Sequence, residues 1–262
     1  MKYILLSFDL EEFDIPMEYG QQIEPSEQMQ ISHQGLDRLI PILTEHNIEC
    51  TFFITAAYAH SYVNEIKNLS LKHEIGSHAY THSGFETNDY SKSKLYLEDI
   101  IEKPVYGFRM PRLALVDIDE IKKSGYQYDS SIHPTWLPGR YNHRHLPENI
   151  YSENGIIRIP CSVSPSPIRF PLFWLSFKNL PLNIYQYFLN QALTKHGYAC
   201  LYFHPWEYAD IGKYKLPGII KSVHGIKLMD KLNRFIKRYK QEGIQFISMK
   251  KYIDLMSSGI KP

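Results

Sequence analysis

Short apolar runs alternate with helical patterns along this chain, and the alternation restricts the fold more than any other sequence feature. The runs are rich in β-branched and aromatic residues and are predicted to be strands at Tyr3–Phe8, Cys50–Ile54, Glu74–Ser77, Val105–Phe108, Tyr126–Tyr128, Gly155–Ile159, Ala199–Phe203 and Gln245–Ile247. Apolar residues at spacings of three and four predict helices at Ser32–His46, Ala56–Leu69, Ser91–Glu102, Asp117–Lys123, Ile184–Lys195 and Ile226–Gln241. Strands that alternate with helices form parallel β/α units, either in an open doubly wound sheet or in a barrel.

The size and charge of the chain narrow its class. A β/α barrel of roughly 250 residues is a single domain, so we expect one domain over residues 1–262. The net charge of +1 gives no reason to expect nucleic acid binding. Three cysteines without a CxxC spacing argue against a disulfide framework and against a cysteine zinc site. Cys50 and Cys200 lie in apolar runs and are expected to be buried thiols.

No targeting segment is expected at the start of the chain. The opening apolar run after Met1 is too short for a signal sequence or a membrane span, and acidic residues follow it at once. We therefore expect no transmembrane segment and a cytoplasmic location.

Two stretches interrupt the alternation. Tyr141–Glu153 is polar and rich in turn residues, so it is predicted to be a loop. Ser164–Leu182 carries four prolines, which disfavour a regular helix or a central strand, and is predicted to be an irregular covering loop. Such a loop could simply pack over the barrel. It could instead form a substrate wall, or a patch that touches a membrane or a lipid-linked substrate.

The sequence HEIGSHAYTHSGF, from His73 to Phe85, contains a candidate metal-binding pair. His78 and His82 are four residues apart, and on a helical turn they would share one face and could reach one ion. This spacing arises by chance on many surface helices, so the pair needs support from other residues.

That support comes from the predicted carboxyl ends of the strands. Polar residues follow five of them: Asp9, Glu11, Glu12, His78, His82, Arg109, Asp129 and His204. Active sites of β/α barrels, and ligand crevices of open parallel sheets, are built at this end. Carboxylates and histidines together make a mixed oxygen and nitrogen metal site, which can leave a position for water.

The ordered motifs SFDLEEFD, HEIGSHAYTH, GFRMPR, YDSSIHPTW and YFHPWEY resemble those of the polysaccharide deacetylase family, carbohydrate esterase family four. The first motif is most similar to the branch found in exopolysaccharide synthesis. The resemblance implies a distorted (β/α)7 barrel and a divalent metal, usually Zn²⁺, held by one carboxylate and two histidines. It also implies hydrolysis of the acetyl group of N-acetylated sugars.

The resemblance also implies roles for single residues. Asp9 matches the catalytic base, and Arg109 matches the arginine that orients it. His78 and His82 match the metal ligands. His204 matches the general acid that protonates the leaving amine.

Three further residues take roles from the same resemblance. Asp129 matches an aspartate that orients catalytic partners. Trp136 or Trp206 could line the acyl pocket.

The chain departs from the family at the third metal ligand. The family has an aspartate there, whereas this chain offers Glu11 or Glu12. Alternation along an extended segment places Asp9 and Glu11 on the same side, which favours Glu11. Glu12 stays open because the strand could end before this point.

Three functions follow from these observations. The first is metal-dependent deacetylation of an amino sugar in a surface polysaccharide or its precursor. The second is hydrolysis of another amide on the same fold, such as deformylation of a lipid-linked amino sugar or opening of a cyclic amide. The third is a catalytically weakened glycan-binding protein that keeps the barrel.

Overall fold

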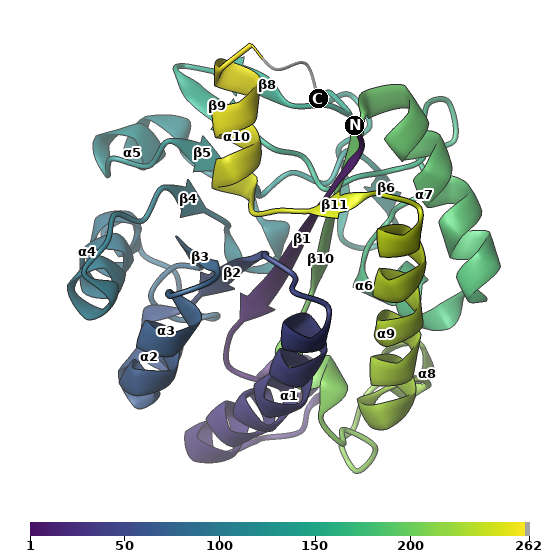
Figure 1. Ribbon diagram of the computed structural model, residues 1–262. Coiled ribbons are helices and arrows are strands. Elements are labelled where there is room, and N and C mark those ends of the chain that lie inside the picture. The colour runs from purple at the N-terminus through teal and green to yellow at the C-terminus, as the bar shows by residue number, and fades with distance from the viewer. Residues whose placement is uncertain (260–262) are drawn as a thin grey trace.

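The computed structural model describes residues 1–259 and contains a nine-stranded, mostly parallel sheet with helices around it (Figure 1). The parallel strands lie in the order β10-β1-β2-β3-β4-β5-β9. Their bounds are Tyr198–Phe203 (β10), Tyr3–Leu10 (β1), Thr51–Ile54 (β2), Glu74–Ser77 (β3), Gly107–Phe108 (β4), Tyr128–Asp129 (β5) and Ile156–Arg158 (β9). This curled parallel sheet is the distorted (β/α)7 barrel that the family resemblance implies, rather than the open doubly wound sheet that the strand pattern also allowed.

The barrel is not closed by a continuous ladder. Between β9 and β10 the connection is made by the segment that follows β9, where the Ser162 amide donates to the Cys200 carbonyl at 2.8 Å. At the edge of the sheet, β8 (Tyr151–Glu153) pairs antiparallel with β9. Strand β11 (Gln245–Phe246) lies outside this order and pairs parallel with the start of β1. A separate hairpin is formed by β6 (Trp136–Leu137) and β7 (Tyr141–Asn142).

Helices surround the strands on the outside of the barrel (Figure 1). They are α1 (Pro25–Glu45), α2 (Ala56–Ser61), α3 (Val63–Leu69), α4 (Asp89–Ile101), α5 (Ile118–Lys123), α6 (Trp174–Asn179), α7 (Leu182–His196), α8 (Gly218–Lys221), α9 (Gly225–Gln241) and α10 (Met249–Ser257). Three short 3-10 helices follow strand ends or loops: η1 (Ile15–Tyr19), η2 (Pro111–Leu113) and η3 (Pro205–Tyr208).

Strand β1 shows how the sequence divides the core. All of its residues are buried, because helices cover its outer face and other strands' side chains fill its inner face. Ile4 and Leu6 belong to the large apolar cluster that includes the helices, whereas Tyr3 and Leu5 belong to a smaller interior cluster. Successive side chains therefore point alternately toward the helices and into the barrel.

Helix α1 approaches the barrel closely at one glycine, and this contact supports the chain beside the site. A Cβ placed on Gly35 would lie 1.9 Å from the carbonyl oxygen of Pro205, in the turn η3. Only a residue without a side chain allows this approach. The glycine thus lets α1 pack directly behind the turn that follows His204.

The predicted strands are all present within two residues of their expected bounds, but several helices differ. Helix α1 begins at Pro25, so the predicted start at Ser32 is wrong; the Ser32 hydroxyl donates to the Glu11 carbonyl at 2.5 Å. The predicted helix Ala56–Leu69 is two helices, because the chain leaves helical geometry at Tyr62. Helices α8 and α10 have no counterpart in the predictions.

The two interrupting stretches also contain regular structure. Tyr141–Glu153, predicted as a loop, contains β7 and β8 near its ends. Ser164–Leu182, predicted as irregular throughout, contains α6, whose residues lie between the prolines rather than on them. In the part of the chain that the structure describes, no helix is both long and apolar enough to cross a membrane.

Candidate metal centre and active site

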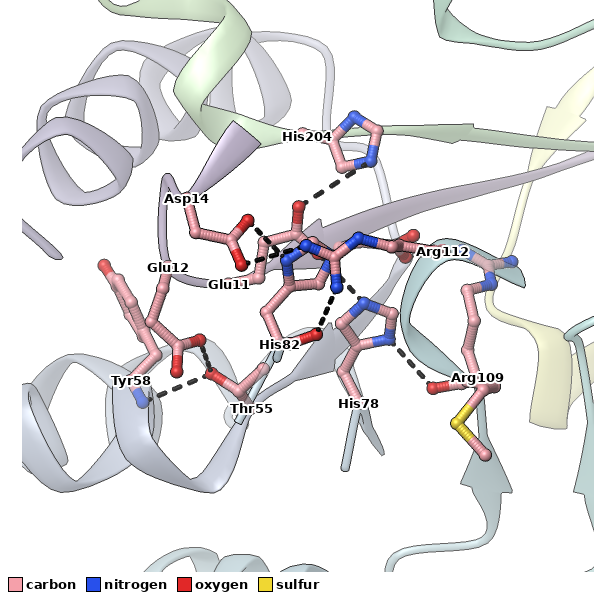
Figure 2. A network of polar contacts seen from close by, with 12 residues as sticks. Glu11, Glu12, Asp14, Thr55, Tyr58, His78, His82, Arg109, Arg112 and His204 are labelled. Carbon is pink, nitrogen blue, oxygen red and sulfur yellow. Dashed lines mark hydrogen bonds and ion pairs between the residues drawn. The ribbon is translucent and has the colours of Figure 1, made fainter. Parts of the chain in front are cut away.

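Of the three carboxylates at the end of β1, two line one pocket and the third points away from it. Strand β1 ends at Leu10, but the alternation continues for one more residue, so Asp9 and Glu11 both line one pocket. Glu12 points the other way, where its Oε2 accepts a hydrogen bond from Thr55 Oγ1 at 2.7 Å (Figure 2). Burial raises the pKa of Glu12, and the hydrogen bond from Thr55, which favours the ionised carboxylate, only partly offsets this effect.

His78 and His82 lie on the loop that follows β3, so the predicted helical turn is wrong. The chain reverses directly after His78, where Ala79 has a φ of 64°. His78 Nδ1 donates to the Arg109 carbonyl at 2.8 Å, and His82 Nδ1 donates to Asp14 Oδ1 at 2.7 Å. Since both partners accept a proton at Nδ1, each Nε2 is left to face the pocket.

Glu11 and the two imidazoles converge on one point (Figure 2). Glu11 Oε2 lies 2.9 Å from His78 Nε2 and 3.2 Å from His82 Nε2, and the three groups could together hold a metal ion. Ligand atoms of a tetrahedral zinc ion with bonds near 2.0–2.1 Å are about 3.3 Å apart, which is close to both distances from Glu11. Two histidines and one glutamate are also a ligand set that catalytic zinc takes.

The charge of Glu11 fits the same role. Burial alone would raise the pKa of Glu11, but His82, His204 and His78 around it hold the pKa well below its usual range. The carboxylate is therefore ionised in a buried place, as a metal ligand must be. In turn, Glu11 and Asp14 outweigh the effect of burial and raise the pKa of His82.

Asp9 is held by a buried arginine. Arg109 Nη1 donates to Asp9 Oδ1 at 2.6 Å and to Ser7 Oγ at 2.9 Å, and its Nε and Nη2 donate to the carbonyl and hydroxyl of Ser130. The guanidinium stacks over the Phe53 ring at 4.2 Å. Burial opposes the charge on Arg109, but Asp9 outweighs it and raises the arginine's pKa. The pair is rigid, and a Lys in place of Arg109 could not make this set of contacts.

His204 follows β10 and is oriented by a carboxylate. Glu207 Oε1 lies 3.2 Å from His204 Nδ1 and also accepts the His204 amide at 2.9 Å, while Lys178 Nζ lies 3.1 Å from Glu207 Oε2. The other ring nitrogen, Nε2, lies 3.9 Å from Glu11 Oε1. Burial would lower the pKa of His204, but Glu11 and Glu207 outweigh it and the pKa is raised. The raised pKa favours the protonated form of this imidazole, whose Nε2 faces the pocket.

These groups lie at one end of a cavity of about 220 Å³. Most of the remaining wall is apolar and comes from separate segments: Ile15, Tyr19, Leu113, Leu137, Tyr141, Phe173, Trp174, Leu175, Tyr202, Trp206, Ile219 and Ile220. The cavity is somewhat below the usual range of roughly 300–1,000 Å³ for drug-sized ligands, so it suits one sugar unit or a small amide.

The two tryptophans expected at the acyl pocket lie in different places. Trp206 is buried in the wall, stacks on His204 with ring centroids 4.9 Å apart, and donates from Nε1 to Glu11 Oε1 at 3.2 Å. Trp136 lies on the β6–β7 hairpin, is 54% exposed and is not among the residues that line the cavity. The structure therefore brings Trp206, but not Trp136, to the site.

Asp129 is buried behind the site rather than in it. Its Oδ2 accepts from Arg158 Nε at 3.0 Å and from the Ser131 amide at 3.1 Å, and its Oδ1 accepts from the Ser131 hydroxyl. Among the described residues it makes no hydrogen bond to Asp9, Arg109 or His204. Its closest link to the site runs through Ser131, whose hydroxyl also accepts from the backbone amide after Arg109.

Sequence reasoning misses several residues of the site, among them Asp14, Arg112 and Trp174. Asp14 orients His82, Arg112 donates to Asp14 Oδ2 at 3.1 Å, and Trp174 packs edge-on against His204 at 5.1 Å. Asp14 stands at the end of the motif SFDLEEFD, so its place beside other acidic residues was a signal. Trp174 had no signal, because the contact depends on how α6 folds back over β10.

Comparisons with known proteins bear on the family and on the fold of this chain. The model of the polysaccharide deacetylase family matches residues 2–128, which include Asp9, Glu11, His78, His82 and Arg109. No curated protein matches the sequence.

Solved structures share the fold at low sequence identity. A Mycobacterium smegmatis protein assigned to the polysaccharide deacetylases is 17% identical, with a TM-score of 0.68 over 99% of this chain and 92% of that chain. PuuE allantoinase is 16% identical, with a TM-score of 0.65 over 95% of this chain and 88% of that chain. A CE4 family pseudoenzyme from Bacillus anthracis is 13% identical, with a TM-score of 0.53 over 95% of this chain and 64% of that chain.

Proposed function

The chain is a member of the polysaccharide deacetylase family, recognised through residues 2–128, and on that premise we propose that it is a metal-dependent deacetylase. Membership places it among the hydrolases that act on carbon–nitrogen bonds other than peptide bonds. The proposed substrate is the N-acetyl group of an amino sugar in a surface polysaccharide or its precursor. The observation that carries the proposal is the convergence of Glu11, His78 and His82 beside Asp9 and His204 in one pocket.

Glu11, His78 and His82 would hold the metal, and a glutamate with two histidines is a ligand set that suits Zn²⁺. When bound there, a zinc ion supplies a Lewis acid and lowers the pKa of water to about 7. Asp14 would keep His82 in the tautomer that offers Nε2 to the ion, and the Arg109 carbonyl would do the same for His78.

Asp9 and His204 would carry the proton transfers. Arg109 donates to Oδ1 of Asp9, which leaves Oδ2 to accept a proton from the attacking water. His204 would give a proton from Nε2 to the leaving nitrogen, since an amide nitrogen leaves poorly unless it is protonated. Glu207 holds the ring through Nδ1, so the proton to be transferred sits on the side of the pocket.

Trp206 and Trp174 would form the wall of the acyl pocket. Both rings pack against His204, at 4.9 and 5.1 Å, so a small acyl group would be enclosed between aromatic surfaces and the catalytic groups. The enclosure would also exclude bulk water from the reacting carbonyl. Asp129 remains a candidate for orienting the site only through its neighbours.

A second candidate is favoured by the apolar wall. Phe173, Trp174 and Leu175 come from the segment Ser164–Leu182 and line the cavity, so this segment acts as a wall rather than as a distant cover. A small cavity with such a wall also suits another amide, such as a formamide on a lipid-linked amino sugar or a cyclic amide. A lipid-linked substrate would bring the chain to a membrane surface; the cytoplasmic location expected from the sequence stays a prediction.

The third candidate, a catalytically weakened glycan-binding protein, rests on the glutamate that replaces the family's aspartate. Glu11 nonetheless reaches both histidines, which favours a metal site over its loss. Metal bound at one ion per chain, together with loss of turnover in Asp9→Asn, would exclude this third candidate.

The experiment that separates the candidates is a product assay on metal-analysed protein. The purified chain is incubated with N-acetylglucosamine oligomers, an N-formylated amino sugar and a cyclic amide, and acetate, formate and ring-opened products are measured. Acetate as the main product supports the first proposal. Formate or a ring-opened product as the main one supports the second, and no acetate from any acetylated sugar overturns the first.

A further inference from the structure

The β6–β7 hairpin presents one side to the pocket and another to solvent. Leu137 and Tyr141 line the pocket, whereas Trp136 is 54% exposed. The guanidinium carbon of Arg144 lies 5.4 Å from the centre of the Trp136 ring. An aromatic ring and a cation are thus held together on the solvent side, next to the pocket wall.

A basic hollow lies on the outer side of the same hairpin. Its volume is about 560 Å³, and it is lined by Asn142, Arg144, His145, Ser166, Pro167 and Arg169, with no carboxylate among them. The lining of this hollow joins the hairpin to the loop of Ser164–Leu182, because Arg169 Nη1 donates to the carbonyls of Pro134 and Leu146.

The loop beside the hollow adds an exposed aliphatic side chain. Ile168 is 66% exposed and lies between two residues of the lining, Pro167 and Arg169. Arg169 itself pairs with the buried Glu148 at 3.0 Å, so Arg144 is the arginine of the lining that has no carboxylate partner among the described residues. From Pro134 to Leu146 the chain contains two arginines and two histidines and no acidic residue.

We propose that this surface, made of Trp136, Arg144, His145, Ile168 and Arg169, docks on the headgroup region of an anionic phospholipid bilayer. Tryptophan is favoured at that depth, because its ring is apolar and its N–H stays in contact with polar groups. Arginine binds phosphate oxygens through paired donors. An exposed isoleucine gains by leaving water. The lining itself has no carboxylate, and Glu148 next to it is buried and paired with Arg169, so little repulsion opposes anionic lipids.

A neutral glycan explains the surface less well. A sugar ring would stack on Trp136, but it would not require the cations or the exposed Ile168. The bilayer uses all three features at once.

Docking in this way would bring the β6–β7 hairpin, which is one wall of the pocket, to the membrane surface. Leu137 and Arg140 belong to the same hairpin and line the pocket, and the exposed Ile219 lines it as well. A membrane-anchored amide could then enter without leaving the lipid phase entirely. The use of such a substrate rests on the proposed function, whereas binding to the bilayer does not.

Vesicle co-sedimentation of the full chain tests the proposal. The probes are vesicles of phosphatidylcholine alone and of phosphatidylcholine mixed with phosphatidylglycerol. We expect binding to the mixed vesicles only, with an affinity that falls as salt is added. Arg144→Gln, Ile168→Ser and Trp136→Ser are each expected to weaken binding at least several-fold.

Matched controls are taken from the helices around the barrel. Leu95→Ser removes another exposed aliphatic side chain, from α4, and Lys237→Gln removes another exposed cation, from α9. Both are expected to bind as the unaltered chain does. Thermal melting of each variant shows that a loss of binding is not a loss of folding.

Three results would overturn the proposal. The first is that the unaltered chain does not bind the mixed vesicles. The second is that the control variants lose as much affinity for the vesicles as the surface variants do. The third is that Trp136→Ser still binds the vesicles but no longer binds soluble N-acetylglucosamine oligomers. The last result would assign the surface to glycan. Vesicle binding without release of any acyl product would instead count against the proposed function alone, and so would leave the docking surface intact.

Discussion

Exchanging each of two neighbouring glutamates for glutamine tests the proposed metal centre most directly. Glu11 Oε2 lies within 3.2 Å of both imidazole nitrogens, whereas the Glu12 carboxylate accepts from Thr55 on the other side of the chain. Glu11→Gln keeps the shape of the side chain but removes its charge and one ligand oxygen. Glu12→Gln makes the same chemical change one residue away, so it is a matched control.

The expected loss follows from the number of ligands. Structural zinc sites with four protein ligands have apparent binding free energies of about 10–16 kcal/mol, or roughly 2.5–4 kcal/mol for each ligand. Removing Glu11 from a site with three protein ligands should therefore weaken zinc binding by about 10²–10³-fold. Glutamine at position 12 can still accept from Thr55, so Glu12→Gln should change the affinity less than about threefold, within the range of surface substitutions.

The assay is a competition titration with a chromophoric chelator, and the metal content of each purified variant is measured alongside it. His78→Ala serves as a positive control, because it removes a proposed ligand for which, unlike Glu11, the adjacent residue is no alternative. A large loss in Glu12→Gln with an unchanged affinity in Glu11→Gln would refute the reasoning. It would mean that the alternation of β1 breaks before Glu11 when the ion binds.

Further predictions concern residues around the ion. Asp14→Asn should weaken metal binding about 10–100-fold in the same titration, as removal of a hydrogen-bond partner of a ligating histidine does, and an unchanged affinity would count against its orienting role. His204→Ala should keep the metal and lose about 10²–10⁴-fold in kcat, and normal turnover would remove it from the mechanism. Because Glu207 raises the pKa of His204, Glu207→Gln should move the alkaline limb of the pH–rate profile to lower pH, and a limb that stays in place would show that His204 is not the acid. Gly35→Ala should destabilise the chain by about 1–3 kcal/mol in denaturant unfolding, because its Cβ would meet the Pro205 carbonyl, and unaltered stability would show that α1 can move away.

The order of strands and helices could be predicted from the sequence because it depends on local periodicity. Each buried strand shows as a run of apolar residues, and each amphipathic helix shows as a 3–4 spacing, whatever the rest of the chain does. The same locality placed Glu11 on the side of Asp9, since two residues along a strand point to one face. It failed at α6, where the prolines of Ser164–Leu182 concealed a short helix between them.

Contacts between distant segments could not be predicted, because nothing in the local pattern encodes them. The pairing of His82 with Asp14 spans 68 residues, and it forms only when the loop after β3 lies beside the start of η1. The two tryptophans show the same limit. Both lie within motifs that resemble those of the family, yet Trp206 is buried against His204 while Trp136 is exposed on its hairpin.

The sequence by itself determined the succession of β/α units and the positions of the polar residues at the strand ends. Those follow from side-chain periodicity and from the short range of backbone hydrogen bonding. Only the tertiary structure decided that Glu11 rather than Glu12 faces the histidines, and that His78 and His82 meet on a loop with both Nε2 atoms turned inward. These outcomes depend on strand register and loop geometry, which are set by packing across the barrel and not by any one segment.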